Sequence, residues 1–205
     1  MSIVKLSNNG VKNATAFGSI TGLGSMIFIK KLTASSSATL SFVHGSGGVD
    51  FSTYKEYIFI FNNIHPESDN VNFQFNGSID AGSNYNVAKT TTYYRATLEE
   101  GGSNGGLAYQ TGADLAQGTG DQIIADQVGA DADQCVSGFL HLFNPSSTTF
   151  VKHFIATTNS TNHGNKSENN FISGYFNTTN DIDAILFKFN GDSIQSGTIT
   201  LYGIS

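Results

Sequence analysis

The amino-acid sequence predicts an all-β fold, an antiparallel β-sandwich with a jelly-roll-like arrangement of about ten strands. Residues 71–76 alternate between apolar and amide side chains, which is the period-two pattern of a strand with one buried face. Residues 54–64, directly before them, are rich in aromatic and β-branched side chains that favour a pleated surface. Pro66 lies between the two runs and cannot donate to a strand ladder, so we expect two neighbouring strands.

The same patterns recur along the chain and are separated by polar turns. Asn190-Gly191, between two alternating runs, is a good hairpin signal. Residues 99–106 and 159–170 are expected to be polar loops, and residues 107–133, which show no sustained period, a long connection with one short strand or helical turn. A different Greek-key sandwich is the alternative to the jelly roll. The other strands are expected at residues 26–32, 38–44, 91–98, 135–143, 149–157, 171–176, 182–189 and 197–204.

Two regions are expected: an N-terminal arm at residues 1–24 and a single β-sandwich domain at residues 25–205. The arm mixes Gly, Asn, Ser and Thr with few apolar residues, so it buries little surface to offset the entropy cost of ordering. Its apolar side chains therefore need a surface elsewhere. The expected oligomer or particle contacts are Ile3, Leu6, Phe17, Ile20 and Leu23.

Charge and cysteine content narrow the function classes. The formal net charge of -6 argues against nucleic-acid binding, because a protein that binds phosphates needs an excess of Lys and Arg. Charged residues make up only 13% of the chain, and such a surface suits contact with other protein, since charged residues are depleted at interface centres. Cys135 is the only cysteine, which excludes an intrachain disulfide, and it is expected to be a small buried residue in a strand.

The N-terminus lacks the basic start, apolar middle and small-residue cleavage site of a secretory signal. No apolar run approaches the ~20 residues that cross a bilayer. We therefore expect a protein that is made in a cytoplasm and does not enter a membrane.

No constellation of residues predicts catalysis, a cofactor or a metal. The five histidines lack the spacing of a metal site, although His141 and His153 lie in strands that are expected to pair. Asp126, Asp131 and Asp133 lack the spacing and the bidentate glutamate of a calcium loop. The protein is therefore predicted not to be an enzyme, with no catalytic residue, no metal and no cofactor.

Four tyrosines, Tyr85, Tyr93, Tyr94 and Tyr109, are the candidate glycan contacts, because tyrosine rings can stack on sugars. The alternative is that they belong to a core edge or a subunit interface, where strand tyrosines are common.

Four segments carry a family resemblance: Tyr54-Lys-Glu-Tyr-Ile-Phe, Asn63-Ile-His-Pro, Ser137-Gly-Phe-Leu-His-Leu-Phe-Asn-Pro and Ser196-Gly-Thr-Ile-Thr-Leu-Tyr-Gly-Ile. They resemble segments of virion-associated structural proteins of tailed bacteriophages, particularly phages of marine bacteria. The resemblance spans residues 25–205 and rests on strand and turn patterns, so it carries over no catalytic residue.

The resemblance implies a non-enzymatic virion structural protein, located in the virion as a head decoration, head fibre or tail component. Its partners would be other virion proteins, and a homotrimer or another cyclic homo-oligomer is expected. The alternative function is a carbohydrate-binding or receptor-binding module of a phage fibre, which contacts a host-surface glycan. A glycan-degrading tail spike is disfavoured, because the chain lacks the 20–50-residue repeat of a β-solenoid.

Overall fold

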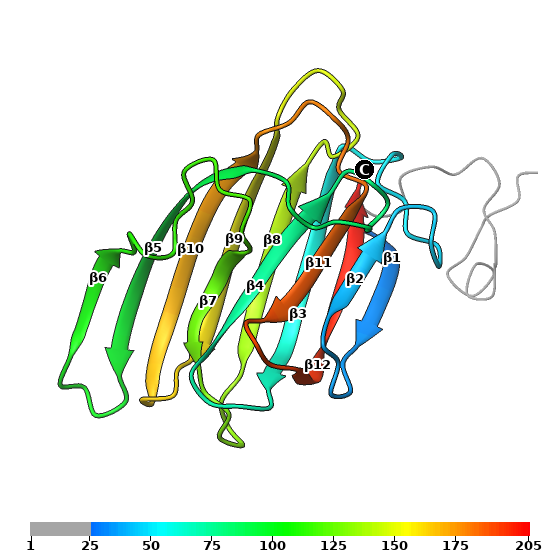
Figure 1. Cartoon of the computed structure of the whole chain (residues 1–205). Coiled ribbons are helices and arrows are strands. Elements are labelled where there is room, and N and C mark those ends of the chain that lie inside the picture. The colour runs from blue at the N-terminus through cyan, green and yellow to red at the C-terminus, as the bar shows by residue number, and fades with distance from the viewer. Residues whose placement is uncertain (1–25) are drawn as a thin grey trace, which may run out of the picture.

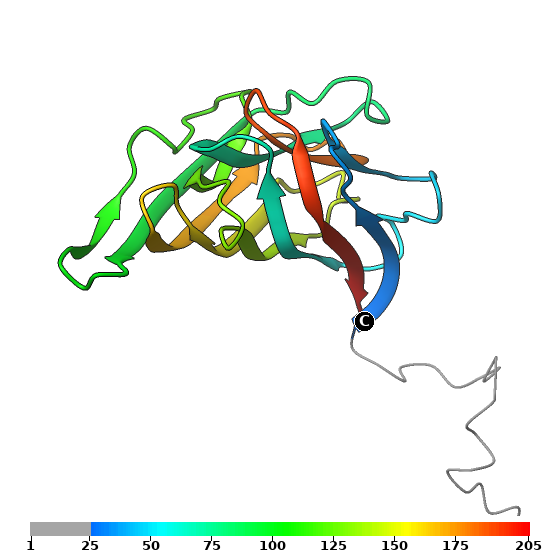
Figure 2. The same ribbon diagram turned by 90° about the horizontal axis from the view of Figure 1, so that it is seen from below.

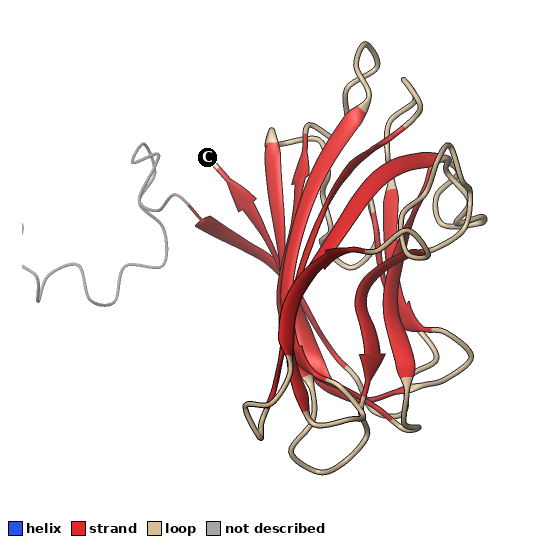
Figure 3. Cartoon of the chain, turned by 90° about the vertical axis from the view of Figure 1, so that its left-hand side faces the viewer, coloured by secondary structure: helices blue, strands red, loops and turns tan. Residues whose placement is uncertain are grey.

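A computed structural model describes residues 26–205, and all regular elements in this range are β-strands (Figure 3). These residues contain no helix that is long and apolar enough to span a membrane. They form twelve strands, where the sequence pattern predicted about ten. The strands are β1 Met26–Thr33, β2 Leu40–Val43, β3 Glu56–Pro66, β4 Val71–Ser78, β5 Lys89–Glu99, β6 Gly105–Tyr109, β7 Gln122–Val128, β8 Val136–Phe143, β9 Lys152–Thr161, β10 Lys166–Phe176, β11 Ala184–Phe189 and β12 Ile194–Ile204.

The strands form two antiparallel sheets that pack face to face (Figure 1). The larger sheet has the order β1-β12-β3-β8-β9-β10-β5-β6, and the smaller has the order β2-β11-β4-β7. The chain changes sheet at every connection except β5–β6, β8–β9 and β9–β10. Two layers of four strands connected in this way, β1-β12-β3-β8 over β2-β11-β4-β7, make a jelly roll. The predicted fold class is therefore confirmed.

Two insertions enlarge one sheet of this jelly roll. The pair β5 and β6 is inserted between β4 and β7, and the pair β9 and β10 between β8 and β11. Both pairs join the sheet beside β8, so the larger sheet has eight strands and the smaller has four. Figures 1 and 2 show β6 lying beyond β7, the last strand of the smaller sheet. The larger sheet therefore extends past the smaller sheet and has a free edge at β6.

The prediction of about ten strands did not place β6, and it allowed only one unplaced short strand or helical turn within residues 107–133, where β7 lies. All five residues of β6 are exposed, so this edge strand has no buried face to produce an alternating pattern. The pairing of β7 with β4 shifts register between Val71 and Phe73 and again between Phe73 and Gln74. Such irregularities interrupt the period of two, and the segment then lacks a recognisable strand signature.

The predicted loop at residues 159–170 is also wrong, because β9 extends to Thr161 and β10 begins at Lys166. The inward-facing residues of this region are polar and almost fully buried: Thr158, Ser160, Glu168 and Asn170. A search for hydrophobic alternation therefore finds nothing, although the backbone pairs regularly from Ser167 to Phe176.

Phenylalanines from both sheets form the core between them. Phe187 of β11 contacts five other phenylalanine rings at centroid distances of 5.1–6.3 Å; these are Phe42, Phe59, Phe61, Phe73 and Phe75. All six rings are at least 98% buried. Because β3 carries Phe59 and Phe61 in the larger sheet, this cluster joins the two layers.

Candidate interaction face

The outer face of the eight-stranded sheet, which is turned away from the four-stranded sheet, carries a continuous apolar band. Burial alternates along each strand: in β3, Tyr57 and Phe59 are buried, whereas Ile58 and Ile60 point outward. The strand register arranges such outward residues in two adjacent rows. One row contains Phe28, Tyr202, Ile58, His141, Ile155, Ser173 and Thr92, and the next contains Thr200, Ile60, Phe139, Thr157, Phe171, Tyr94 and Tyr109.

We call these two rows the apolar band. None of the residues named in it is Lys, Arg, Asp or Glu, and the second row continues into β1 at the exposed Lys31, which lies opposite Thr200. Its side chains are accessible: Phe28 is 60% exposed, Tyr109 50% and Ile155 47%. The band is about 34 Å long, because seven spacings of about 4.8 Å separate eight strands. An antiparallel sheet that faces water normally alternates apolar inside with polar outside. An aromatic band of this length, with charged residues only at its margins (Lys31 and Glu56), instead has the composition of a protein interface.

A recess of about 470 Å³ adjoins the band on the outer face and is lined in part by Phe143, His153, Ile155 and Tyr175. A second recess of about 530 Å³ shares Phe143 and His153 and includes Phe150. Phe150 lies in the β8–β9 loop and is 69% exposed. The outer face therefore carries apolar side chains and two recesses, one of them beside the exposed ring of Phe150. Side chains of a partner can pack into these recesses.

The two candidate strand histidines belong to this face and do not make a metal site. His141 Nε2 lies 2.9 Å from Glu56 Oε2, and its ring packs on Phe143 with a centroid distance of 4.1 Å. His153 contacts the ring of Tyr175 instead. Among residues 26–205, no group of three metal-ligating side chains lies close enough to hold an ion.

The four candidate tyrosines are divided among different places. Tyr94 stacks on Phe171, with ring centroids 5.0 Å apart and planes 13° from parallel, and its register partner is Tyr109. The hydroxyl of Tyr109 donates to Asp114 over 2.7 Å. These two tyrosines therefore lie together on the outer face, as one end of the apolar band.

The other two tyrosines do not join them. Tyr93 is fully buried, and its hydroxyl donates to Asn170 over 2.6 Å. Burial raises the pKa of Tyr93 well above its usual value. Including Tyr93 among the candidate glycan contacts is therefore a mistake, because neighbouring residues of a strand point to opposite faces. Tyr85 is half-buried in the connection between β4 and β5, outside the band.

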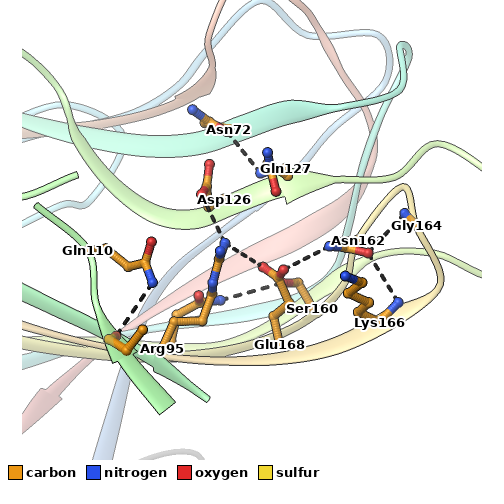
Figure 4. A network of polar contacts seen from close by, with 12 residues as sticks. Asn72, Arg95, Gln110, Asp126, Gln127, Ser160, Asn162, Gly164, Lys166 and Glu168 are labelled. Carbon is orange, nitrogen blue, oxygen red and sulfur yellow. Dashed lines mark hydrogen bonds and ion pairs between the residues drawn. The ribbon is translucent and has the colours of Figure 1, made fainter. Parts of the chain in front are cut away.

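A network of polar residues, which sequence reasoning did not find, lies inside the sandwich behind this face (Figure 4). Arg95 Nη1 donates to Asp126 over 2.9 Å and to Glu168 over 3.1 Å. The other oxygen of Glu168 accepts a bond of 2.8 Å from Asn162. The Glu168 side chain is only 1% exposed, and burial raises its pKa despite the opposing charge of Arg95. The network ties β7 to β5 and β10, so its role is structural.

Cys135 differs from its predicted position. It lies just before β8 and is partly exposed, so it is not a buried strand residue. The pKa of its thiol is raised by partial burial, which lowers the fraction of reactive thiolate at neutral pH.

Comparisons with protein-family models, with curated proteins and with solved structures find no match to this chain.

Proposed function

We propose that this protein is a non-enzymatic structural protein of a tailed-phage virion that acts by protein–protein assembly through its outer face. The apolar band carries the proposal, because accessible aromatic and branched side chains are stabilised when a partner covers them. The resemblance of residues 25–205 to virion proteins favours the particle as the place of assembly. The role as a head decoration, head fibre or tail component follows from that resemblance.

The partners proposed are other virion proteins and further copies of this chain, as a homotrimer or another cyclic oligomer. The band begins at β1, the strand that directly follows the predicted arm. The proposed contacts Ile3, Leu6, Phe17, Ile20 and Leu23 lie outside the described residues. They would add a second point of attachment near the β1 edge of the same sheet.

Deletion of residues 1–24 is expected to leave the sandwich folded and to abolish incorporation into particles, because the sequence of the arm has few apolar residues to bury in a core. Circular dichroism would show the retained fold, and quantitative mass spectrometry of purified particles would measure occupancy. Full occupancy of the truncated protein would rule out the arm as an attachment device. Light scattering that gives only a monomer at high concentration would refute an intrinsic oligomer.

The second candidate function is a carbohydrate-binding module. Tyr94 and Tyr109 favour it, because they are 44% and 50% exposed at one end of the band, where Tyr94 stacks on the partly buried ring of Phe171. A glycan array separates the two candidates. Binding that is lost in Tyr94→Ala and retained in Tyr85→Ala favours the module. Copurification with intact particles and no binding above background favours the structural protein.

A further inference from the structure

A buried lysine and a buried asparagine meet between the two sheets. Asn76 lies in β4 of the smaller sheet, and Lys89 begins β5 of the larger one. Asn76 is 1% exposed and Lys89 is fully buried. Lys89 Nζ donates to the side-chain oxygen of Asn76 over 2.6 Å and to the carbonyl of Val87 over 2.9 Å, and it lies 5.7 Å from the ring centre of Phe176. The amine is thus held in a mostly apolar site against a carboxamide.

The environment of Lys89 increases the fraction of its neutral, nucleophilic form. Burial lowers the pKa of Lys89 to about 8, although the charge of Asp121 opposes this shift. A desolvated lysine near neutral pH has an appreciable fraction of free amine, which is the form that attacks a carbonyl carbon.

The hydrogen-bond partners of the Asn76 carboxamide include an oxyanion donor and a carboxylate, the two kinds of group that assist acyl transfer. Its oxygen accepts a bond of 2.9 Å from the backbone N–H of Gly77, a donor placed where negative charge would develop during attack. Its nitrogen donates to Asp121 over 2.9 Å and to the carbonyl of Thr119 over 3.2 Å. A carboxylate in contact with the leaving nitrogen can supply the proton that this nitrogen needs.

We propose that Lys89 and Asn76 join in an intramolecular isopeptide bond. Neutral Lys89 Nζ attacks Asn76 Cγ, and the Gly77 N–H stabilises the resulting oxyanion. Asp121 accepts one proton from Nζ and passes it to Nδ2 of Asn76. The Cγ–Nδ2 bond then breaks, one ammonia leaves, and a secondary amide links the two side chains. The reaction exchanges one amide for another and needs no oxidant, reductant or cofactor.

Lys152 provides the contrast within the same fold. It is also fully buried, but its Nζ donates to the backbone carbonyl of Thr178 over 3.2 Å. No hydrogen bond between Lys152 and a side-chain amide is found among residues 26–205. The nucleophile, the carboxamide, the oxyanion donor and the carboxylate come together at Lys89. The bond would join β4 to β5, and therefore one sheet to the other, independently of the proposed function.

Intact-protein and peptide mass spectrometry of the purified full-length protein test the proposal. The expected mass is that of the sequence less one ammonia. Trypsin is expected not to cleave after Lys89, so that residues 56–95 remain one peptide that is lighter by one ammonia. Fragmentation of this peptide is expected to release no backbone ions between Asn76 and Lys89, because the bond closes that loop.

Two variants make the test specific. Lys89→Met, which removes the nucleophile and a buried charge, should restore the mass expected for its own sequence. Lys152→Met should keep the loss of ammonia. Asp121→Asn should slow formation of the bond, so that a fraction of unlinked protein appears.

Two results would overturn the proposal. One is an unmodified mass together with full cleavage after Lys89. The other is a loss of ammonia that persists in Lys89→Met, which would identify a succinimide formed at Asn76-Gly77 instead.

Discussion

Replacing Phe187 by alanine is expected to lower the free energy of unfolding by about 3–5 kcal/mol, the range for a phenylalanine truncated in a close-packed core. Phe187 is fully buried and contacts rings from both sheets, among them Phe59 and Phe61 of β3 and Phe73 of β4. A cavity at this position would remove the contacts that join the layers. Urea denaturation followed by circular dichroism measures the change.

Phe150→Ala is the matched control for Phe187→Ala. It removes the same ring from a position that is 69% exposed, so the free energy of unfolding should change by less than ~0.5 kcal/mol. Equal losses in the two variants would contradict the packing of Phe187 between the sheets.

Replacing Arg95 by methionine is expected to cost about 3–5 kcal/mol of stability at neutral pH, because it leaves a buried carboxylate without its counter-charge. Glu168 is the group left unpaired, since its side chain is 1% exposed, whereas Asp126 is 21% exposed and can be solvated. Thermal and urea unfolding would measure this loss.

The loss in Arg95→Met should depend on pH in a defined direction. The pKa of Glu168 is already raised by burial, and removing Arg95 raises it further. A carboxyl group whose folded pKa is raised contributes stability below its unfolded pKa and loses it as pH rises through the folded pKa. The deficit should therefore grow from about pH 4 upward. Unfolding measured from pH 4 to pH 7 tests this.

The double variant Arg95→Met/Glu168→Gln is the control for this prediction. It removes both charges, so it should recover much of the lost stability at neutral pH and show a weaker pH dependence. The prediction is contradicted if Arg95→Met loses the same free energy of unfolding at every pH and Glu168→Gln does not restore it. Glu168 would then not be an unpaired buried carboxylate in Arg95→Met.

The sequence predicted those parts of the fold whose buried face is apolar. Val71, Phe73 and Phe75 alternate with polar residues, and they lie in β4 as expected. The pattern failed only where β9 ends and β10 begins. There Glu168 and Asn170 point inward, and they form hydrogen bonds with Asn162 and Thr158. A buried polar network has the hydropathy of a loop, so hydropathy alone cannot reveal it.

The candidate site was less accessible to sequence reasoning. Strand alternation could have separated Tyr93 from Tyr94, because adjacent residues cannot share a face. By contrast, the apolar band depends on strand register. Phe28 and Tyr109 are far apart in the chain and lie at opposite edges of one sheet, because the insertions β5–β6 and β9–β10 extend it. Nothing local in the sequence encodes that order.

The most direct test of the outer face as the assembly surface is the particle occupancy of the double variant Ile60→Glu/Ile155→Glu. Both residues are exposed in the apolar band, so the fold should persist while a partner would have to bury two carboxylates. The matched control is Ser41→Glu/Gln74→Glu, at outward positions of the four-stranded sheet. Quantitative mass spectrometry of purified particles should find the control at normal occupancy and the band variant absent. A folded band variant at full occupancy would contradict assembly through this face.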